Sequence, residues 1–366
     1  QLKTAIRRRA GDHPGLPFVG GIGWRRALIP GGVPRKEMLD EVIKDRPVIL
    51  MSYSGQDGWL NSIAARMLVE RNPAALEELM PVRDEATREL TGEFRYFHAI
   101  NFLDYFTWEE LGAASEEGIM AGMTRTLDEA LSFGVTTMND VQIYPQFVPL
   151  ILKFRDRGGL DKVRARCTYY VGHERLKDED RLRADLARWK EIGKKESGAH
   201  LVLGDSLKFC IDGTPDTHTS FYLEPFADDP ANFGEATWTQ EEFNRVIEIS
   251  DGMGLQACTH SIGDAGIRRV INAYENAGRV NGKRDARHRV EHCEMPAAED
   301  RKRMGRLGIL ASMQPTHFFG DEVAEKALGP ERMNRCMPWR SLEQAGVSVS
   351  FGSDWCNSPL NPMYGL

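Results

Sequence analysis

The feature that most constrains the fold of this chain is a regular alternation of strand-like and helix-like segments from about residue 115 onward. Seven short apolar runs follow one another: GVTTMNDV, VRARCTYYV, SLKFCIDG, LQACTHSIGD, HRVEHCEM, GILASMQPTH and VSVSFGSDW. Strands that alternate with helices predict an α/β fold, in which a parallel sheet has helical crossovers. Seven such units are one short of a closed (β/α)8 TIM barrel.

Helical patterns fill most of the intervals between these runs. The first predicted helix begins after Ser115, carries its apolar residues on one face and ends near Gly134. Further helices are expected at about residues 145–157, 174–195, 239–252, 264–277, 298–307 and 341–345. Residues 1–114 do not follow the alternation, and we interpret them as a separate region with several helical segments that caps the barrel mouth.

Composition excludes several classes of protein. The chain has 366 residues, of which 41% are hydrophobic and 28% charged, enough to build a core. A net charge of -7 argues against a nucleic-acid-binding surface, and no apolar run is long enough to span a bilayer. The six cysteines form no CxxC pair, so they are expected to be reduced thiols of a cytoplasmic protein.

Polar and ionisable residues stand at the ends of these predicted strands. In a barrel the carboxyl ends of the strands converge on one face, and active sites lie there. A single strand-end residue is typically structural, but a series on successive strands indicates a site. The series comprises Asp140, His173, Lys208 with Asp212, His260, His292, His317 and Asp354.

Three members of this series have the chemistry of metal ligands. His260, His292 and Asp354 offer the imidazole and carboxylate groups that suit Zn²⁺ and similar divalent ions. They lie one and two βα units apart, as expected for strands 5, 6 and 8 if LKFCIDG is strand 4. Lys208 lies inside that predicted strand, where an ammonium is costly unless it is paired or neutralised.

The motifs LKFCIDG, CTHSIGDAG, RVEHCEM, SMQPTH and FGSDW resemble successive strand-end motifs of the amidohydrolase superfamily. They are similar in particular to amidohydrolase family 3, the branch of N-substituted formamide deformylase-like enzymes, in which some members are labelled exoenzyme regulatory proteins. The likeness runs from about residue 16 to the last residue. It implies a distorted (β/α)8 barrel that binds one or two divalent metal ions, usually zinc.

The resemblance also implies roles for individual residues. His260 and His292 would be metal ligands, and Lys208 would be carboxylated and bridge two ions. Asp354 would bind metal and act as general acid and base during the attack of metal-activated water. The expected reaction is hydrolysis of an amide-type C–N bond other than a peptide bond, in a small-molecule substrate.

The sequence departs from this pattern at three points. The family has a His-x-His pair at the end of strand 1, and this sequence contains none. It also stops just after strand 8, without the flanking small β domain. We therefore expect residues 1–114 to be an insertion between strands 1 and 2, and residues 115–366 to hold strands 2–8. Gln56 stands where many relatives have His, which leaves a substrate role there in doubt.

Four further residues are candidates for contact with substrate. His317 ends strand 7, and Asp212 ends strand 4. His218 lies in the polar loop GTPDTHTS directly after Lys208, and Trp59 could line the mouth from the cap. Structural roles are the alternative for each of them, above all packing for Trp59. A homodimer is the default expectation for a soluble oligomer.

Two other functions compete with a metal-dependent hydrolase. The chain could be a catalytically silent barrel that binds a ligand or regulates a partner, because one fold hosts many functions. It could also be a metal-free barrel whose histidines act as acid and base. The joint presence of Lys208, His260, His292 and Asp354 favours the metal-dependent enzyme, because neither alternative accounts for a lysine in a core strand.

Overall fold

The structure is a computed structural model that describes residues 2–53, 57–71, 73, 81–95, 116–318 and 322–366. The chain divides into two compact units, Gln1–Met123 and Thr124–Leu366. The division lies within helix α4 (Glu116–Ser132), so this helix contributes residues to both units.

Unit 1 contains a five-stranded sheet in the order β1-β2-β3-β5-β4. Strands β1 and β2 are parallel, and the remaining neighbours are antiparallel. Its elements are α1 (Leu2–Asp12), β1 (Val19–Trp24), α2 (Lys36–Asp40), β2 (Val48–Ser52), β3 (Gly58–Leu60), α3 (Ser62–Arg71), β4 (Pro81–Arg83) and β5 (Leu90–Phe94).

The sequence predicted several helical segments in this unit, and the structure shows in addition that a sheet forms its centre. Strand β2 is buried along its whole length. Successive side chains of a strand point to opposite faces. Ile49 and Met51 therefore enter one apolar cluster, whereas Val48 and Leu50 enter another that contains Trp59. A run of consecutive apolar residues suits a strand that is covered on both faces.

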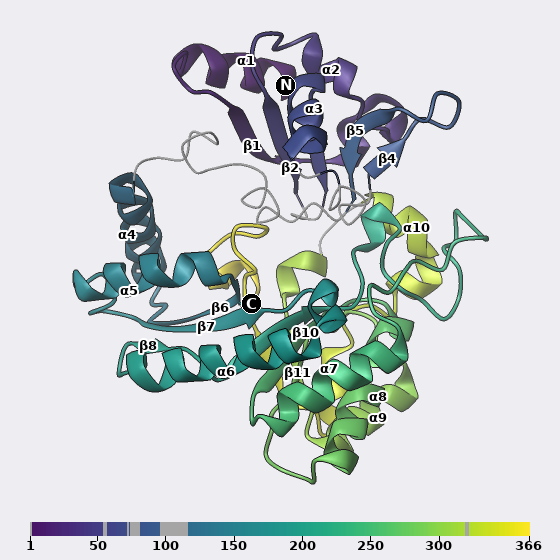
Figure 1. The fold of residues 1–366 in the computed structure, drawn as a ribbon. Coiled ribbons are helices and arrows are strands. Elements are labelled where there is room, and N and C mark those ends of the chain that lie inside the picture. Colours follow the sequence, from purple (N-terminus) through teal and green to yellow (C-terminus); the bar gives the residue numbers. More distant parts are fainter. Residues whose placement is uncertain (1, 54–56, 72, 74–80, 96–115, 319–321) are drawn as a thin grey trace. The chain divides into compact units, whose positions relative to one another are not determined.

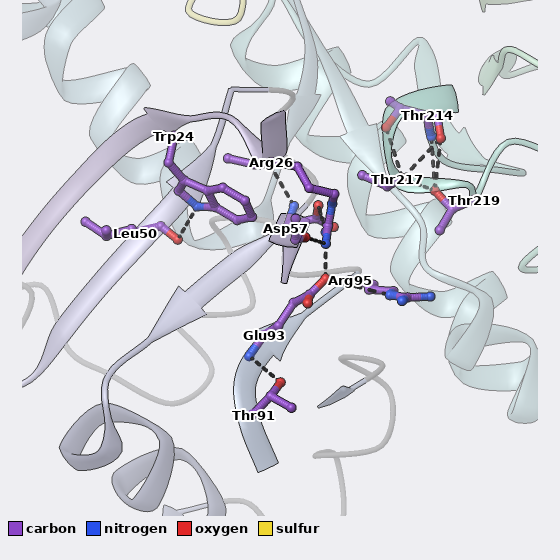
Figure 2. Close-up of polar contacts among 12 residues, drawn as sticks. Trp24, Arg26, Leu50, Asp57, Thr91, Glu93, Arg95, Thr214, Thr217 and Thr219 are labelled. Carbon is purple, nitrogen blue, oxygen red and sulfur yellow. Dashed lines mark hydrogen bonds and ion pairs between the residues drawn. The ribbon is translucent and has the colours of Figure 1, made fainter. Parts of the chain in front are cut away.

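A buried ionic cluster joins three segments of unit 1 (Figure 2). One terminal nitrogen of Arg26 lies 3.0 Å from an Asp57 carboxylate oxygen and 2.6 Å from a Glu93 carboxylate oxygen. Burial works to lower the pKa of Arg26, but the two carboxylates outweigh it and raise that pKa. The pairing keeps these charged groups compensated inside the unit.

Unit 2 follows the predicted alternation of strands and helices. No helix in the described part of the chain is long and apolar enough to cross a membrane. After α4 the elements are β6 (Thr137–Ile143), α5 (Val148–Asp156), β7 (Arg164–Tyr170), α6 (Glu179–Glu196), β8 (Leu201–Val202), β9 (Ser206–Cys210), α7 (Gln240–Gly252), β10 (Gln256–Ser261), α8 (Asp264–Val280), β11 (Arg289–His292), α9 (Ala298–Leu307), β12 (Leu310–Met313), α10 (Glu322–Met333), α11 (Trp339–Gln344) and β13 (Val349–Phe351).

The strands of unit 2 form one parallel sheet. Its order is β13-β12-β11-β10-β9-β7-β6, with β8 paired to β7. Each of the seven predicted strand segments overlaps one of the strands in this series, and neighbours along the chain are neighbours in the sheet. Strand β8, which has two residues, was not predicted. The α/β class and the parallel sheet are thereby confirmed.

The sheet is curled, because residues on strands that are not neighbours meet across its concave face. With its side-chain oxygen turned toward β11, Asn139 of β6 accepts hydrogen bonds from both terminal nitrogens of Arg289, at 3.0 and 2.8 Å. Arg166 of β7 donates to Gln256 of β10 at 2.7 Å, although β9 lies between these strands. The sheet is thus part of a barrel wall.

The helices cover the convex face of this sheet, and α6, α7, α8 and α9 can be followed there in Figure 1. Leu207 and Phe209 alternate with Lys208 along β9 and are fully buried against this layer. Phe209 meets the ring of Phe243 on α7 edge to face at 5.8 Å. Trp189 of α6 donates to the carbonyl of Ser206 at 3.1 Å. The apolar core of the unit therefore lies outside the curl, and polar side chains occupy the inside.

Candidate metal-binding active site

The candidate site lies at the carboxyl ends of β9, β10 and β11. In the register of the sheet, Lys208 is opposite Cys258, Cys210 is opposite His260 and Ser261 is opposite His292. Because side chains alternate along a strand, Lys208 and His260 point to the same face of the sheet. The structure thus brings these residues together from strands that are far apart in the sequence.

His260 and His292 are in direct contact. Their ring centroids are 4.4 Å apart in an edge-to-face arrangement, and both side chains are buried. Burial lowers the pKa of each imidazole well below 6.5, and the nearby Lys208 ammonium acts in the same direction. Both rings are therefore neutral at neutral pH, which is the form that binds metal ions.

Lys208 is 5% exposed, so its side chain lies almost entirely inside the unit. Among the described residues, no hydrogen bond or ion pair to its ammonium is found. Its neighbours include the imidazoles of His260 and His292 and the thiol of Cys258, none of which is a carboxylate. A buried ammonium beside two imidazoles is unfavourable unless an anionic group joins it or the lysine itself is modified.

The end of β11 has an unusual backbone. His292 has φ of 70° and Cys293 has φ of 50°, so two consecutive non-glycine residues lie in the left-handed region. Such conformations cost of the order of 1 kcal/mol or more each and persist where the surrounding structure imposes them. The turn ends the strand and carries the next residue, Glu294, toward the side chain of His317.

Glu294, His317 and Asp354 form a chain of alternating carboxylate and imidazole groups. His317 lies in a 3₁₀ turn, η8 (Pro315–Phe318). Its Nδ1 is 3.6 Å from Glu294 Oε1, and its Nε2 is 3.7 Å from Asp354 Oδ2. Burial works to lower the pKa of His317, but the two carboxylates outweigh it and raise that pKa above 6.5.

Asp354 follows β13 and is the most exposed member of the candidate site. Its side chain is 35% exposed, and its backbone is left-handed with φ of 54°. Asn357 donates to its Oδ2 at 3.2 Å. The carboxylate also works to raise the pKa of His260, so it lies close enough to interact electrostatically with that imidazole.

One group of His, Cys, Asp or Glu side chains in the described residues can hold a metal ion. It consists of His292, Glu294 and His317, whose ligand atoms all lie within 4.8 Å of one another. The sequence motifs predicted His292 in the metal site and His317 beside substrate, but they did not single out Glu294. The motif RVEHCEM contained a signal, an acid two residues after the strand-end histidine.

Asp212 is buried under backbone donors. Its carboxylate accepts hydrogen bonds from the backbone N–H groups of Ile262, Gly263 and Phe221, at 3.0, 2.9 and 3.0 Å. Burial raises its pKa to about 7, against the effect of these donors. The side chain ties the loop after β9 to the loop after β10, and its Oδ1 lies 3.9 Å from Nε2 of His260.

The other substrate candidates lie in different places. His218 follows the turn η7 (Pro215–Thr217), and its Nε2 is 2.8 Å from Asp228 Oδ1. Trp59 is 3% exposed in the core of unit 1, where its indole N–H donates to the carbonyl of Arg35 at 3.0 Å. Trp59 therefore packs in the apolar core of unit 1. Gln56 lies outside the described residues.

The sequence profile described as "Amidohydrolase family" matches residues 1–366, the whole of this chain. The chain belongs to the amidohydrolase family.

Two relatives with curated names align with almost all of the chain. Protein LONG AFTER FAR-RED 3 of Arabidopsis thaliana is 27% identical over 362 residues, which cover 94% of this chain and 59% of the relative. YtcJ of Bacillus subtilis (strain 168), named as a candidate amidohydrolase, is 28% identical over 379 residues, which cover 100% of this chain and 66% of the relative. The chain thus spans less than two thirds of either relative.

Solved structures of two archaeal proteins share the fold. Both are described as uncharacterized metal-dependent hydrolases. The protein from Pyrococcus furiosus has a TM-score of 0.65 and 21% identity, over 100% of this chain and 69% of its own. The protein from Pyrococcus horikoshii OT3 has a TM-score of 0.66 and 20% identity, over 99% of this chain and 66% of its own. The likeness to these two structures extends over almost the whole chain, and it supports the barrel-type α/β architecture.

Proposed function

We propose that this chain carries the active site of a metal-dependent hydrolase that cleaves amide-type C–N bonds other than peptide bonds. The N-substituted formamide deformylase-like branch is the part of the amidohydrolase family that its motifs favour. The observation that carries the proposal is the direct contact between the rings of His260 and His292, with Lys208 on the same face of the curled sheet as His260. Membership of the amidohydrolase family supports it.

The residues at this edge fit a divalent metal ion. His292 is buried, and its Nδ1 has no hydrogen-bond partner among the described residues. An orphaned buried nitrogen is costly, and a metal ion would satisfy it. We assign His260, His292, Asp354 and a carboxylated Lys208 as ligands, and zinc is the ion that this donor set favours. Such an ion supplies water of lowered pKa and polarises the substrate carbonyl.

Asp354 is the residue assigned to proton transfer. Its carboxylate is partly exposed, so it can reach both a water molecule and the leaving nitrogen of a bound substrate. We propose that it accepts a proton from the attacking water and then donates it to that nitrogen, as a general base and then a general acid. Asn357 donates a hydrogen bond to Oδ2 of this carboxylate, and His317 Nε2 lies 3.7 Å from the same oxygen.

Carboxylation would account for the environment of Lys208. Addition of CO2 to the neutral amine forms a carbamate with loss of a proton, which replaces a cation beside two imidazoles by an anion. A divalent ion would then compensate that anion. If this is correct, protein prepared with ¹³C-labelled CO2 will show one labelled carbamate per chain, and Lys208→Met will show none.

The test of the proposed function is an assay with N-formyl and N-acyl amines before and after metal removal. We expect hydrolysis of at least one of these compounds, loss of activity after dialysis against a chelator, and recovery when zinc is restored. A protein that is fully active without metal would refute the proposal, and so would a full-length protein that holds no divalent ion after purification without chelators.

A further inference from the structure

We infer that Glu294 and His317, together with His292, hold a divalent cation at a second position beside Lys208 and His260. This inference rests on the proposed function, because it concerns the same edge of the sheet. It adds two ligands that the sequence motifs did not assign. With an ion on each side, His292 would lose its remaining N–H proton to solvent, because a neutral imidazole has one free lone pair and an imidazolate has two.

The spacing of the donor atoms is that of a metal site and not of a hydrogen bond. His317 Nδ1 and Glu294 Oε1 are 3.6 Å apart, longer than an N–H···O hydrogen bond. Two ligands at about 2.0–2.1 Å from a tetrahedral zinc ion lie about 3.4 Å from each other. All three ligand atoms lie within 4.8 Å of one another, so one ion can reach them with small side-chain shifts.

A second observation points to a ligand at this place. His292 is 8% exposed, and its Nδ1 is buried without a hydrogen-bond partner among the residues that the structure describes. The ring of His292 lies almost parallel to that of His317, with centroids 5.7 Å apart and an angle of 16° between them. The left-handed turn at His292 and Cys293 places Glu294 next to both rings.

The group also has an outer carboxylate of the kind that orients metal-binding histidines. A histidine that ligates a metal usually directs its other ring nitrogen to a carboxylate, which sets its tautomer and orientation. His317 faces Glu294 with Nδ1 and Asp354 with Nε2, at 3.6 and 3.7 Å. At 3.7 Å the contact of Asp354 with His317 Nε2 is an ion pair and not a hydrogen bond, and Asp354 faces the ring nitrogen that does not face Glu294.

The donor set selects the class of ion. Two imidazoles and one carboxylate are the ligands of hydrolytic zinc sites, which leave a position open for water or substrate. Mg²⁺ and Ca²⁺ prefer sites made of oxygen atoms. We therefore expect zinc, or a similar borderline ion such as cobalt, to occupy this position and magnesium and calcium to leave it empty.

Crystals of the unaltered protein grown with zinc give the most direct test. We expect an anomalous difference peak in contact with Glu294 and His317. A zinc peak bounded only by Lys208, His260 and Asp354 would overturn this inference and leave the proposed function standing. Absence of a peak at both positions would overturn both.

Zinc titration of variants tests the same inference in solution. Removal of an outer partner of a metal-binding histidine lowers metal affinity by about 10- to 100-fold. Loss of a direct ligand should exceed that range, so we expect Glu294→Gln and His317→Gln each to weaken one zinc equivalent by more than about 100-fold. The matched controls are Glu299→Gln and His200→Gln, which alter exposed residues away from the site. Unchanged zinc affinity in both site variants, with weakened affinity in His260→Gln, would show that the ion lies elsewhere.

Discussion

At the scale of single residues, His292 has the most constrained position in the candidate site. It ends β11 in a left-handed conformation and contacts the rings of both His260 and His317. A left-handed conformation is strained in a non-glycine residue, whereas the extended conformation of the residues earlier in the strand is not. Strain of this kind is typical of functional sites, and here it would serve to direct the imidazole of His292 toward His260 and His317.

Replacement of His292 by alanine should separate metal binding from folding. The variant loses a ligand common to both proposed metal positions, so we expect its zinc content to fall sharply after dialysis at neutral pH. Removal of a direct ligand should weaken binding by more than about 100-fold. Elemental analysis of the purified protein measures this. Full zinc occupancy in the variant would show that the ligand assignment is wrong.

Replacement of Asp354 by asparagine should remove the proposed proton transfer and leave the fold intact. The amide keeps the size of the side chain but cannot accept and return a proton. We expect the rate of hydrolysis to fall by about 100- to 10,000-fold, the range for loss of a general acid–base group, with a circular dichroism spectrum like that of the unaltered protein. Hydrolysis at an unchanged rate would exclude the proposed role of Asp354.

At the scale of elements, the loop after β9 is held to the start of α8 by close packing. Asp212 accepts backbone donors from both segments. Helix α8 can approach this carboxylate because Gly266 has no side chain. A Cβ atom at Gly266 would lie 2.6 Å from Ser261 Oγ and 2.8 Å from Asp212 Oδ2. The position of the loop that carries His218 therefore depends on the absence of a side chain at Gly266 of α8.

Two alanine variants of α8 should have opposite effects on stability. Gly266→Ala forces a methyl group against Asp212, and overpacking of this kind costs about 1–3 kcal/mol. Gly278→Ala adds a methyl group where nothing lies within 4 Å, and it should stabilise the helix by up to about 1 kcal/mol. Urea unfolding measures both. Equal stability of the two variants would contradict the packing argument.

At the scale of the whole unit, a polar network at the amino-terminal end of the strands links α7 to β10 and β11. Asp251 on α7 accepts hydrogen bonds from Arg284 at 2.6 Å, from Asn281 at 2.9 Å and from His288 Nε2 at 3.2 Å. His288 Nδ1 accepts the backbone N–H of Ala257 at 3.0 Å. Because Nδ1 accepts this bond, the imidazole is neutral with its proton on Nε2.

This network should make the unit sensitive to acid. Burial works to raise the pKa of Asp251, but its hydrogen bonds outweigh that effect and hold the pKa at about 2, below the ordinary 3.8. Its contribution to stability is therefore present above about pH 4 and is lost as the pH falls toward 2. Burial lowers the pKa of His288 from 6.5, so the unfolded chain takes up that proton first and stability already falls below about pH 6.5.

Unfolding by urea at several pH values tests this prediction. We expect the free energy of unfolding of the unaltered protein to decrease from neutral pH to about pH 4. Asp251→Asn should be less stable at neutral pH, because a carboxylate with three donors is lost, and its stability should depend less on pH below about 4. Parallel pH profiles for the two proteins would show that Asp251 does not contribute.

Much of the fold could be predicted from local sequence patterns. The alternation of strand and helix is encoded in the spacing of apolar residues, so all seven main strands of unit 2 and their parallel order were expected. Polar residues at strand ends also predicted that Lys208, His260 and His292 lie near one another, because parallel strands bring their carboxyl ends to one edge; their role as ligands stays a prediction. In unit 1 the apolar run of β2 suits a helix or a strand equally well by pattern alone, and only pairing with β1 and β3 decides for a strand.

The sequence by itself determined which residue types are available at the carboxyl edge of the sheet, and the tertiary structure decided which of them meet. Glu294 joins His292 and His317 because two left-handed residues turn the chain after β11, and backbone angles of that kind leave no periodic signal. Asp212 is occupied by donors from two separate loops, and Trp59 is enclosed by the core of unit 1. These contacts depend on segments distant in sequence, so side-chain direction and burial become defined only when the elements pack.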